Sequence, residues 1–157
     1  MKKLFYFLAL FVVSFNAVAQ DGDDVVEMDQ EVVIQMDFNK SLYANNFGNM
    51  YMSESPKAVL MAMLIPQNYE SGKAELSKAM EPDLKNFKAQ EFTEKGLKYY
   101  SCTGEMKQEG VDVFVEVMIK KADDNSCVMI SSMYEVGAKS KFDKEAKRAI
   151  ISAKISE

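Results

Sequence analysis

Apolar residues alternate with other residues early in the chain, and this pattern predicts a strand. Over residues 32–38 every even position is apolar, which is the period-two pattern of a half-buried strand. A helix beginning at Asp24 is the alternative interpretation, because Val25, Met28, Val32 and Met36 also recur at helical spacing.

A hairpin and then a helix are predicted next. The apolar runs 47–53 and 58–65 flank a turn at 54–57, where Pro56 fixes one backbone dihedral and removes an N–H donor. From Ser71 the spacing becomes helical, and Pro82 is expected to end this helix near Met80. The apolar face of the helix would consist of Leu76, Met80, Leu84 and Phe87.

The second half of the chain predicts a meander of strands and a closing helix. Phe92 leads into a Lys95-Gly96 turn, and further strands are expected at 97–106, 111–120 and 127–134. The strand at 111–120 is apolar at every odd position, and its other face carries Asp112, Phe114, Glu116 and Met118. Ser140 and Asp143 have the spacing of a capping box. The helix that follows would bury one face, made of Phe142, Ala146, Ala149, Ile150 and Ala153.

This order of elements predicts an α+β fold. We expect an antiparallel sheet of about five to six strands, formed by the hairpin and the meander. Because the meander is apolar on both faces, helices should pack on both sides of the sheet, in an α/β/α sandwich-like arrangement. The predicted organisation is a signal peptide at 1–19, an acidic N-terminal segment at 20–40 and a single domain at 41–157.

The first 19 residues have the composition of a cleaved export signal. Lys2 and Lys3 precede an apolar run at 4–15, and Ala17-Val18-Ala19 supplies the small residues of a cleavage site. About a dozen apolar residues fall short of the roughly 20 that a membrane-spanning helix needs. Gln20 follows the predicted cut, where a lipoprotein would have cysteine. We therefore predict a secreted or periplasmic protein, soluble after cleavage between Ala19 and Gln20.

Acidic residues dominate the start of the predicted mature chain. The net charge moves from −5 to −7 when Lys2 and Lys3 are removed, so nucleic acid is not an expected partner. Seven acidic side chains precede Lys40, the first basic residue after the cut. They could ligate a divalent cation, but Asp21-Gly22-Asp23-Asp24 lacks the spacing of a calcium loop. A solvated terminus is the simpler interpretation, and no metal site is predicted.

Two cysteines in an exported chain raise the question of a disulfide. If tight turns set the register, Cys102 lies opposite Val115 on the core face and Cys127 lies opposite Lys120 on the reverse face. Cysteines on opposite faces and two strands apart cannot reach the Cβ separation of a disulfide. We expect unpaired cysteines, unless a bulge or a different strand order changes the register.

The residue inventory excludes most catalytic chemistry. The chain has no histidine, which removes the commonest general base and the commonest transition-metal ligand. Carboxylate-based glycoside hydrolysis is the one hydrolytic chemistry that we retain, with Glu105, Glu116 and Glu135 as the strand-borne candidates. The glycines are scattered singly and form no phosphate-binding loop. We expect no catalytic residue and no cofactor.

Methionine is the strongest positive feature of the sequence. Met50, Met52, Met61 and Met63 would share one face of the predicted hairpin for any two- or four-residue turn. Flexible, polarisable thioethers suit a surface that accepts varied apolar partners, so these four are the candidate binding residues. A core role beneath a helix is the simpler interpretation. A similar cluster is expected on the reverse face of the meander, formed by Phe114, Met118, Met129 and Met133.

The order of a hairpin, a helix, a meander and a C-terminal helix resembles the PsbP/Mog-like domain over residues 41–157. The end of the chain, Ala149-Ile150-Ile151-Ser152-Ala153-Lys154-Ile155, is similar to the closing helix of that family, with its serine before a final lysine. The resemblance implies an antiparallel sheet with helices on both faces. It also implies an accessory or binding role without a common enzymatic activity, although no residue can be matched to a specific partner.

These features together predict an exported, non-catalytic accessory or binding protein of the cell envelope. Its partner would be a protein or an apolar ligand of the envelope, contacted first through the methionines and second through the acidic segment. No stable membrane anchor is expected after signal cleavage. The alternatives are a carboxylate-dependent hydrolase of an envelope polymer and a purely structural module.

Overall fold

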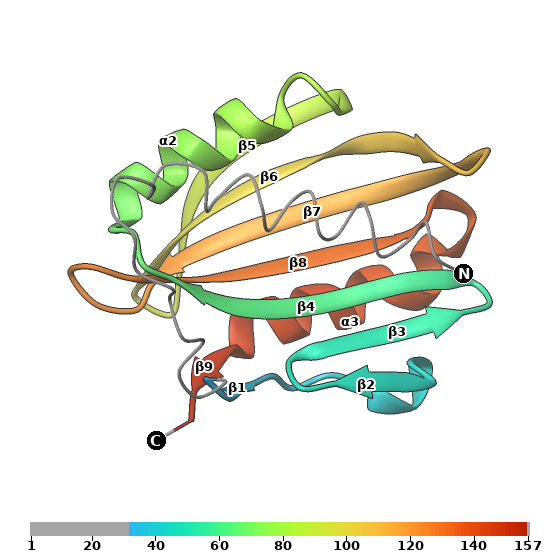
Figure 1. The fold of residues 1–157 in the computed structure, drawn as a ribbon, viewed down its shortest axis with the longest axis horizontal. Helices are drawn as coiled ribbons and strands as arrows, with labels where there is room; N and C mark the ends of the chain where they lie inside the picture. The colour runs from blue at the N-terminus through green and yellow to red at the C-terminus, as the bar shows by residue number, and fades with distance from the viewer. Residues whose placement is uncertain (1–31, 157) are drawn as a thin grey trace, which may run out of the picture. The chain divides into compact units, whose positions relative to one another are not determined.

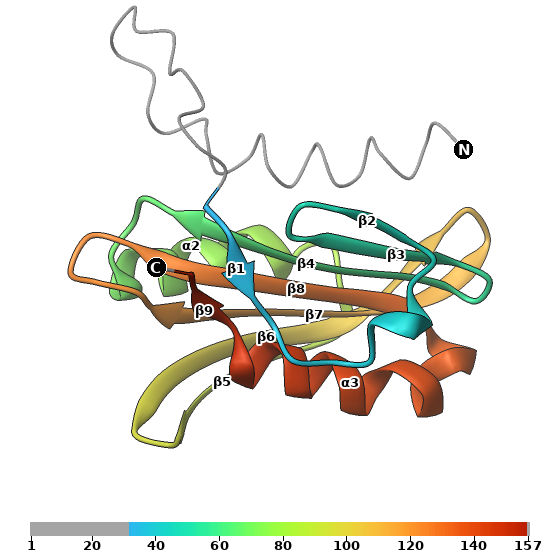
Figure 2. The same cartoon turned by 90° about the horizontal axis from the view of Figure 1, so that it is seen from below.

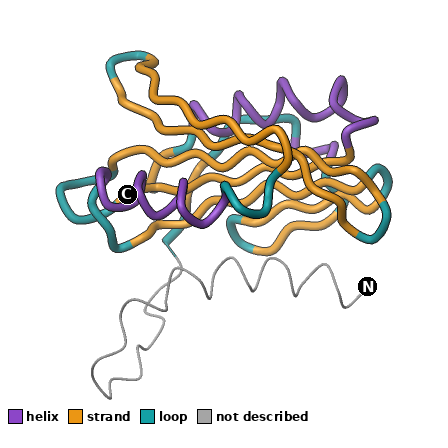
Figure 3. Tube along the Cα trace, turned by 90° about the horizontal axis from the view of Figure 1, so that it is seen from above, coloured by secondary structure: helices purple, strands orange, loops and turns teal. Residues whose placement is uncertain are grey.

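The computed structural model describes residues 32–156, which form an antiparallel sheet with one α-helix on each side (Figure 1). Figures 2 and 3 show the two helices, α2 and α3, separated by the strands. The predicted signal peptide at 1–19 lies outside the described residues, as does the acidic segment before residue 32.

Seven strands make up the large sheet, in the order β2-β3-β4-β8-β7-β6-β5, with every neighbouring pair antiparallel. The predicted α+β fold, with its hairpin and meander, is confirmed. The sequence pattern does not predict β2, because a three-residue strand is too short to show a period. The strands span Asn45–Phe47 (β2), Met50–Glu54 (β3), Lys57–Ile65 (β4), Lys85–Glu94 (β5), Leu97–Gln108 (β6), Val111–Lys121 (β7) and Cys127–Glu135 (β8).

Two-residue turns set the register of four hairpins, β2–β3, β3–β4, β5–β6 and β6–β7. The β3–β4 hairpin closes at Ser55-Pro56, with Glu54 paired to Lys57, where the proline predicts a turn. The β6–β7 hairpin closes at Glu109-Gly110, and both residues have positive φ, 51° and 84°. Positive φ at both positions gives a turn whose twist matches that of the flanking strands.

Helix α2 (Tyr69–Met80) begins where the side chain of Asn68 accepts a hydrogen bond from a backbone N–H of the first turn, at 3.0 Å. This cap satisfies one of the donors that a helix start leaves free. The helix ends at Met80, as the following proline predicts. The prediction that Leu84 and Phe87 extend its apolar face is wrong, because the chain turns after Met80 and Phe87 lies in β5.

Helix α3 (Lys139–Ser152) continues directly from a short 3-10 helix, η2 (Val136–Ala138). The backbone N–H of Lys139 bonds to the carbonyl of Val136, so the preceding turn, and no side chain, leads into the helix. The capping box predicted at Ser140 is therefore wrong. The predicted apolar face is confirmed, since all its members are buried: Phe142, Ala146, Ala149, Ile150 and Ala153.

Two side chains of the sheet hold the C-terminal end of α3. Lys120 donates from Nζ to the carbonyl of Ala153, and the Tyr99 hydroxyl donates to the carbonyl of Ile151 at 3.3 Å. These bonds satisfy carbonyls that a helix end leaves without intrahelical partners. A lysine here also interacts favourably with the negative end of the helix dipole, although burial lowers the pKa of Lys120.

The first described residues form a strap that runs along α3. β1 (Ile34–Gln35) pairs with β9 (Lys154–Ile155), and the chain then continues to the 3-10 helix η1 (Lys40–Leu42). The backbone N–H of Asp37 donates to Ser152 Oγ at 2.8 Å. Backbone groups of the strap thus form hydrogen bonds with side chains of α3, where a strand would bond to a neighbouring strand. Only Ile34 and Gln35 pair as a strand, so the rest of the strand predicted at 32–38 is wrong.

An aromatic core fills the space between the sheet and α3. The strap and β3 contribute Phe38, Tyr43 and Tyr51, whose rings meet edge to face, with centroids 4.8 Å apart for Phe38 and Tyr51. Tyr134 of β8 stacks on Phe142 of α3. Such contacts add to the free energy of burying the rings. We name this side of the sheet the α3 face.

The register of β7 on β8 differs by one residue from the sequence prediction. Lys121, and not Lys120, pairs with Cys127, because five residues, 122–126, connect the two strands. The backbone N–H groups of Ala122 and Asp123 both donate to the carbonyl of Ser126 and close this loop. A one-residue change moves every side chain of a strand to the other face, so the predicted orientation of β8 is wrong.

Both cysteines are buried and unpaired, as predicted, but for a different reason. Cys102 pairs with Val117, which keeps it on its predicted face. The register of β8 places Cys127 on the same face, and β7 lies between the two cysteines. Strands two positions apart in a sheet are about 9.5 Å apart, beyond the reach of a disulfide.

The α3 face also buries one carboxyl group, that of Glu116, which is 6% exposed. The Ser101 hydroxyl donates to it at 3.4 Å. Burial raises the pKa of the Glu116 carboxyl, against the opposing charge of Lys147. Lys147 and the Tyr134 hydroxyl both donate to the carboxylate of Asp143, at 2.9 Å each, so Asp143 is the anion that the lysine holds.

We expect Glu116→Gln to stabilise the protein at neutral pH. Because burial raises the folded-state pKa of this carboxyl, its contribution to stability is complete below the unfolded-state pKa and is lost as the pH rises through the folded value. The Tm of the variant should therefore rise relative to that of the wild type as the pH increases from about 4, near the ordinary pKa of a glutamate, to neutral pH. Glu105→Gln, on the neighbouring strand, controls for the loss of one charge. A Tm difference that stays constant over this range would contradict the prediction.

Gly104→Ala tests the packing of β6 against the chain that enters β5. A Cβ on Gly104 would lie 2.7 Å from Leu84 Cβ and 2.9 Å from the carbonyl oxygen of Lys85. We expect a loss of about 1–3 kcal/mol in the free energy of unfolding, measured with urea, as for other overpacked sites. Gly137→Ala is the matched control, because no heavy atom lies within 4 Å of the added methyl group. Equal losses in the two variants would contradict the prediction.

Candidate binding surface

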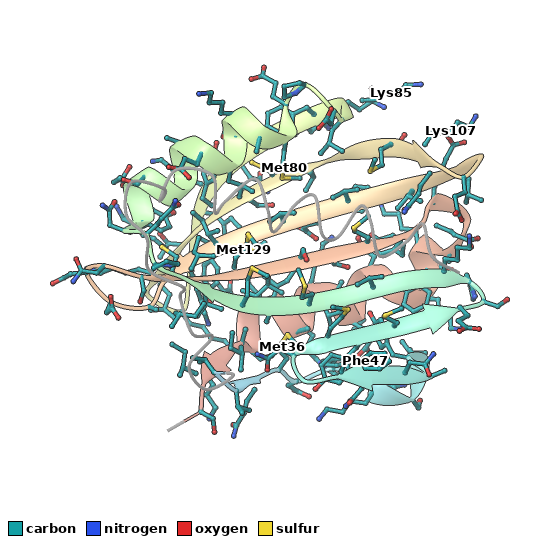
Figure 4. The ribbon with its side chains drawn as sticks, in the orientation of Figure 1. Met36, Phe47, Met80, Lys85, Lys107 and Met129 are labelled. Atoms are coloured by element: carbon teal, nitrogen blue, oxygen red, sulfur yellow. The ribbon has the colours of Figure 1, made fainter. Side chains whose placement is uncertain are left out.

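Six methionines lie on one side of β3, β4 and β8, on the side of the sheet opposite α3. We name them the methionine face: Met50, Met52, Met61, Met63, Met129 and Met133. Met50 pairs directly with Met61, and Met63 pairs with Met129, which Figure 4 labels on β8 beside β4. The structure thus brings the four methionines singled out in the sequence together and adds two more from β8.

The methionine face is partly accessible. Met50, Met52 and Met63 are half-buried, whereas Met61 is 6% and Met129 2% exposed. Helix α2 packs on β6 and β7, and in Figure 1 no helix of residues 32–156 crosses β3 on this side. The expected alternative, a core role, therefore fits the buried Met61 and Met129 better than it fits the three half-buried residues.

Polar groups and α2 bound the methionine face at its two ends. At the β3–β4 turn, Lys57 Nζ lies 2.8 Å from a carboxylate oxygen of Glu109, and the backbone N–H of Lys57 donates to Glu135 at 2.9 Å. At the other end, Gly72 of α2 approaches the sheet so closely that a Cβ there would lie 3.3 Å from Ile119. The accessible thioethers lie between these two boundaries.

A network of side chains fastens α2 to the edge strand β5. Lys73 Nζ lies 3.0 Å from Glu91 and 3.1 Å from Glu70. The Tyr69 hydroxyl also donates to Glu91, at 3.3 Å, and burial together with this carboxylate raises the pKa of Tyr69 to about 12. These side chains form hydrogen bonds and ion pairs with one another, which explains their grouping by the attachment of α2 to β5 and not by a ligand site.

Cys102 has the surroundings of a structural residue. Its Sγ lies 3.8 Å from Ser77 Oγ of α2, and the Ser77 hydroxyl is also hydrogen-bonded to that of Tyr100. Burial raises the pKa of the Cys102 thiol, which disfavours the thiolate that a nucleophile or a metal ligand requires.

The strand-borne carboxylates do not form one acidic site. Glu105 and Glu116 lie on the α3 face, whereas Glu135 pairs with Val113 and lies on the other side of the sheet. Glu116 is buried, so a polymeric substrate cannot reach its carboxyl in this structure. Within residues 32–156, no three His, Cys, Asp or Glu side chains are grouped so that they could hold a metal ion.

The cluster expected on the reverse face of the meander does not form. Phe114 and Met118 lie on the α3 face and pack in its core, whereas Met129 and Met133 belong to the methionine face. The error has the same cause as that for Cys127, namely the odd number of residues in the β7–β8 loop. The signal that could have revealed it is Asp123, whose side chain accepts from the backbone N–H of Asn125 at 2.7 Å and lengthens the turn.

None of the helices within residues 32–156 is long and apolar enough to span a membrane. The signal peptide predicted at 1–19, with its predicted cleavage after Ala19, lies outside this part of the chain.

Comparison with known proteins identifies similar folds among solved structures. No protein-family model and no curated protein matches the chain. LpqN of Mycobacterium tuberculosis, described as involved in cell envelope biogenesis, has a TM-score of 0.54 and 10% identity, over 79% of this chain and 83% of LpqN. PA94 of Pseudomonas aeruginosa, a protein of unknown function, has a TM-score of 0.54 and 11% identity, over 83% of this chain and 88% of PA94.

The similar structures also include a PsbP protein, in agreement with the resemblance noted in the sequence. It is CyanoP of Synechocystis, with a TM-score of 0.42 and 10% identity, over 87% of this chain and 99% of CyanoP. At such identities LpqN and PA94 show a shared fold alone.

Proposed function

We propose that this chain is an exported, non-catalytic accessory protein of the cell envelope that binds an apolar surface of a partner protein through the methionine face. The observation that carries the proposal is the half-buried state of Met50, Met52 and Met63 on a sheet surface rich in thioethers. Unbranched, polarisable side chains can adapt to a partner's shape at low energetic cost.

The envelope location is proposed on two grounds. The charged start, apolar run and small-residue site at 1–19 are typical of an export signal. LpqN, which has the same fold, is described as involved in cell envelope biogenesis, and we extend that location to this chain by analogy. We propose a non-catalytic role because the chain has no histidine and its buried Glu116 is out of reach of a substrate.

Site-specific crosslinking tests the binding surface. A photoreactive amino acid at Met52 or Met63 should capture one partner from the native envelope, whereas the same group at exposed Lys144 of α3 should not. The Kd of the purified pair should then weaken by about tenfold or more in a Met50→Ser/Met52→Ser/Met63→Ser variant, because several central contacts carry most of the binding energy.

The matched variant replaces the same three methionines with leucine. Leucine keeps the apolar volume, so the Kd should stay within about threefold of the wild-type value. Thermal unfolding of both variants controls for loss of the fold. The proposal fails if a folded serine variant binds as tightly as the wild type, or if Lys144 yields the same crosslinks.

Processing of the N-terminus tests export. Protein recovered from the envelope fraction should have Gln20 as its first residue by intact mass, because signal peptidase cuts after a small-x-small sequence. Replacing Ala17 and Ala19 with bulky residues should leave the full-length chain unprocessed. Full-length wild-type protein confined to the cytoplasm would contradict export without bearing on the binding surface.

A further inference from the structure

We propose that the methionine face contains a Cu(I) site whose ligands are the thioether sulfurs of Met50, Met61 and Met63. Met129 lies beside them. The inference rests on the proposed function in one respect, the access of solutes to this face. It goes further by assigning a metal and a set of sulfur ligands to residues that, in the proposed function, only pack against an apolar partner.

The strand register brings these three side chains within reach of one ion. Met50 and Met61 are direct partners across β3 and β4, where Cβ atoms of facing residues lie about 4.5–5.5 Å apart. Met63 is the diagonal neighbour of Met50 and the next residue after Met61 on the same face of β4. Each sulfur is two bonds beyond Cβ on a chain with three rotatable bonds, so the three can converge without movement of the backbone.

Exposure of the three side chains suits a site that is loaded from solution. Met50 and Met63 are half-buried, whereas Met61, between them, is 6% exposed. An ion from solution would therefore meet the accessible sulfurs of Met50 and Met63 first, and the buried sulfur of Met61 would be its third ligand. Met129, directly opposite Met63 and 2% exposed, closes the apolar side of the site.

The ligand type selects the metal. Thioether sulfur is a soft ligand that favours Cu(I), whereas calcium and magnesium require oxygen ligands. The chain has no histidine to recruit zinc or Cu(II), and its described residues contain no group of three Cys, Asp or Glu side chains that could hold another ion. A methionine site is therefore the metal chemistry that this surface can support.

The two cysteines are the competing soft ligands. Both are buried, and burial raises the pKa of each thiol, so the thiolate form that binds metal is disfavoured at neutral pH. Cys102 and Cys127 also lie on strands separated by β7 and cannot chelate one ion together. Thioethers carry no proton, so a methionine site has no such requirement.

Competition between the purified protein and the Cu(I) chelator bicinchoninate tests the proposal. The wild type should bind one Cu(I). The affinity of Met50→Leu/Met61→Leu/Met63→Leu for Cu(I) should fall by more than about 10-fold, because loss of the ligands themselves should cost more than loss of the groups that hydrogen-bond to metal ligands. Met36→Leu/Met118→Leu, which replaces methionines packed against the α3 face, should keep the wild-type affinity. If the triple variant unfolds, Met50→Leu/Met63→Leu, which spares the buried Met61, should show the loss.

Two further measurements separate thioether from thiolate binding. The affinity should be constant between about pH 5.5 and 8, because no ligand has to lose a proton, whereas a thiolate site would gain affinity with pH. X-ray absorption of the bound copper should show a first shell of sulfur alone, and Cys102→Ser/Cys127→Ser should leave it unchanged.

Retention of Cu(I) by the folded leucine variant would overturn the proposal. So would loss of Cu(I) from the cysteine variant only, or failure of the wild type to compete with the chelator. The leucine variant also separates this inference from the proposed function, because it removes sulfur and keeps the apolar surface. Partner binding without copper binding would refute the metal site alone, whereas copper binding without a partner would refute the docking role alone.

Discussion

The pairing of β7 with β8 is the constraint on which the arrangement of both sheet faces depends. Side chains alternate along a strand, so the five-residue connection between Lys121 and Cys127 determines which alternate side chains of β8 face α3. With this register, Val128, Ile130 and Tyr134 enter the aromatic core. An even loop would instead have placed methionines under α3 and left the tyrosine on the opposite side.

The two faces of the sheet differ in how strictly they are packed. The α3 face contains stacked and edge-to-face rings, and it also holds groups with defined hydrogen bonds, such as Tyr134 with Asp143. Aromatic rings have fixed shapes and few rotamers, so this side specifies one arrangement of helix and strap. The methionine face consists of side chains that can repack. The α3 face thus fixes the fold, whereas the methionine face on the opposite side of the sheet can adapt its side chains.

Much of the fold is readable from the sequence, because the long elements have strong periods. The α+β class, the β3–β4 hairpin, the end of α2 at Met80 and the buried face of α3 all follow from local patterns. β2 has too few residues to show a period, whereas the alternation over 32–38 predicts a longer strand than β1, in which only Ile34 and Gln35 pair with another strand. The start of α3 differs from prediction because a 3-10 turn, with Lys139 bonded to Val136, leads into the helix in place of a side-chain cap.

Only part of the methionine face can be predicted from the sequence, for a related reason. Met50 and Met61 share a face for any even turn, so local alternation was enough to bring the first four methionines together. Met129 and Met133 could be placed only once the β7–β8 loop was known, because their orientation depends on its odd length. Exposure of the face depends on where α2 packs, which no local pattern reveals.

The pairing of β1 with β9 makes the described chain a nearly closed loop. Ile34 meets Ile155, and the backbone N–H of Ser156 donates to the carbonyl of Val33 at 2.8 Å, so residues near the two ends hold each other. A domain boundary placed at residue 41 would cut this closure and leave β9 and the end of α3 without their partner. The first residues of the strap therefore belong to the same folding unit as helix α3, along which they run.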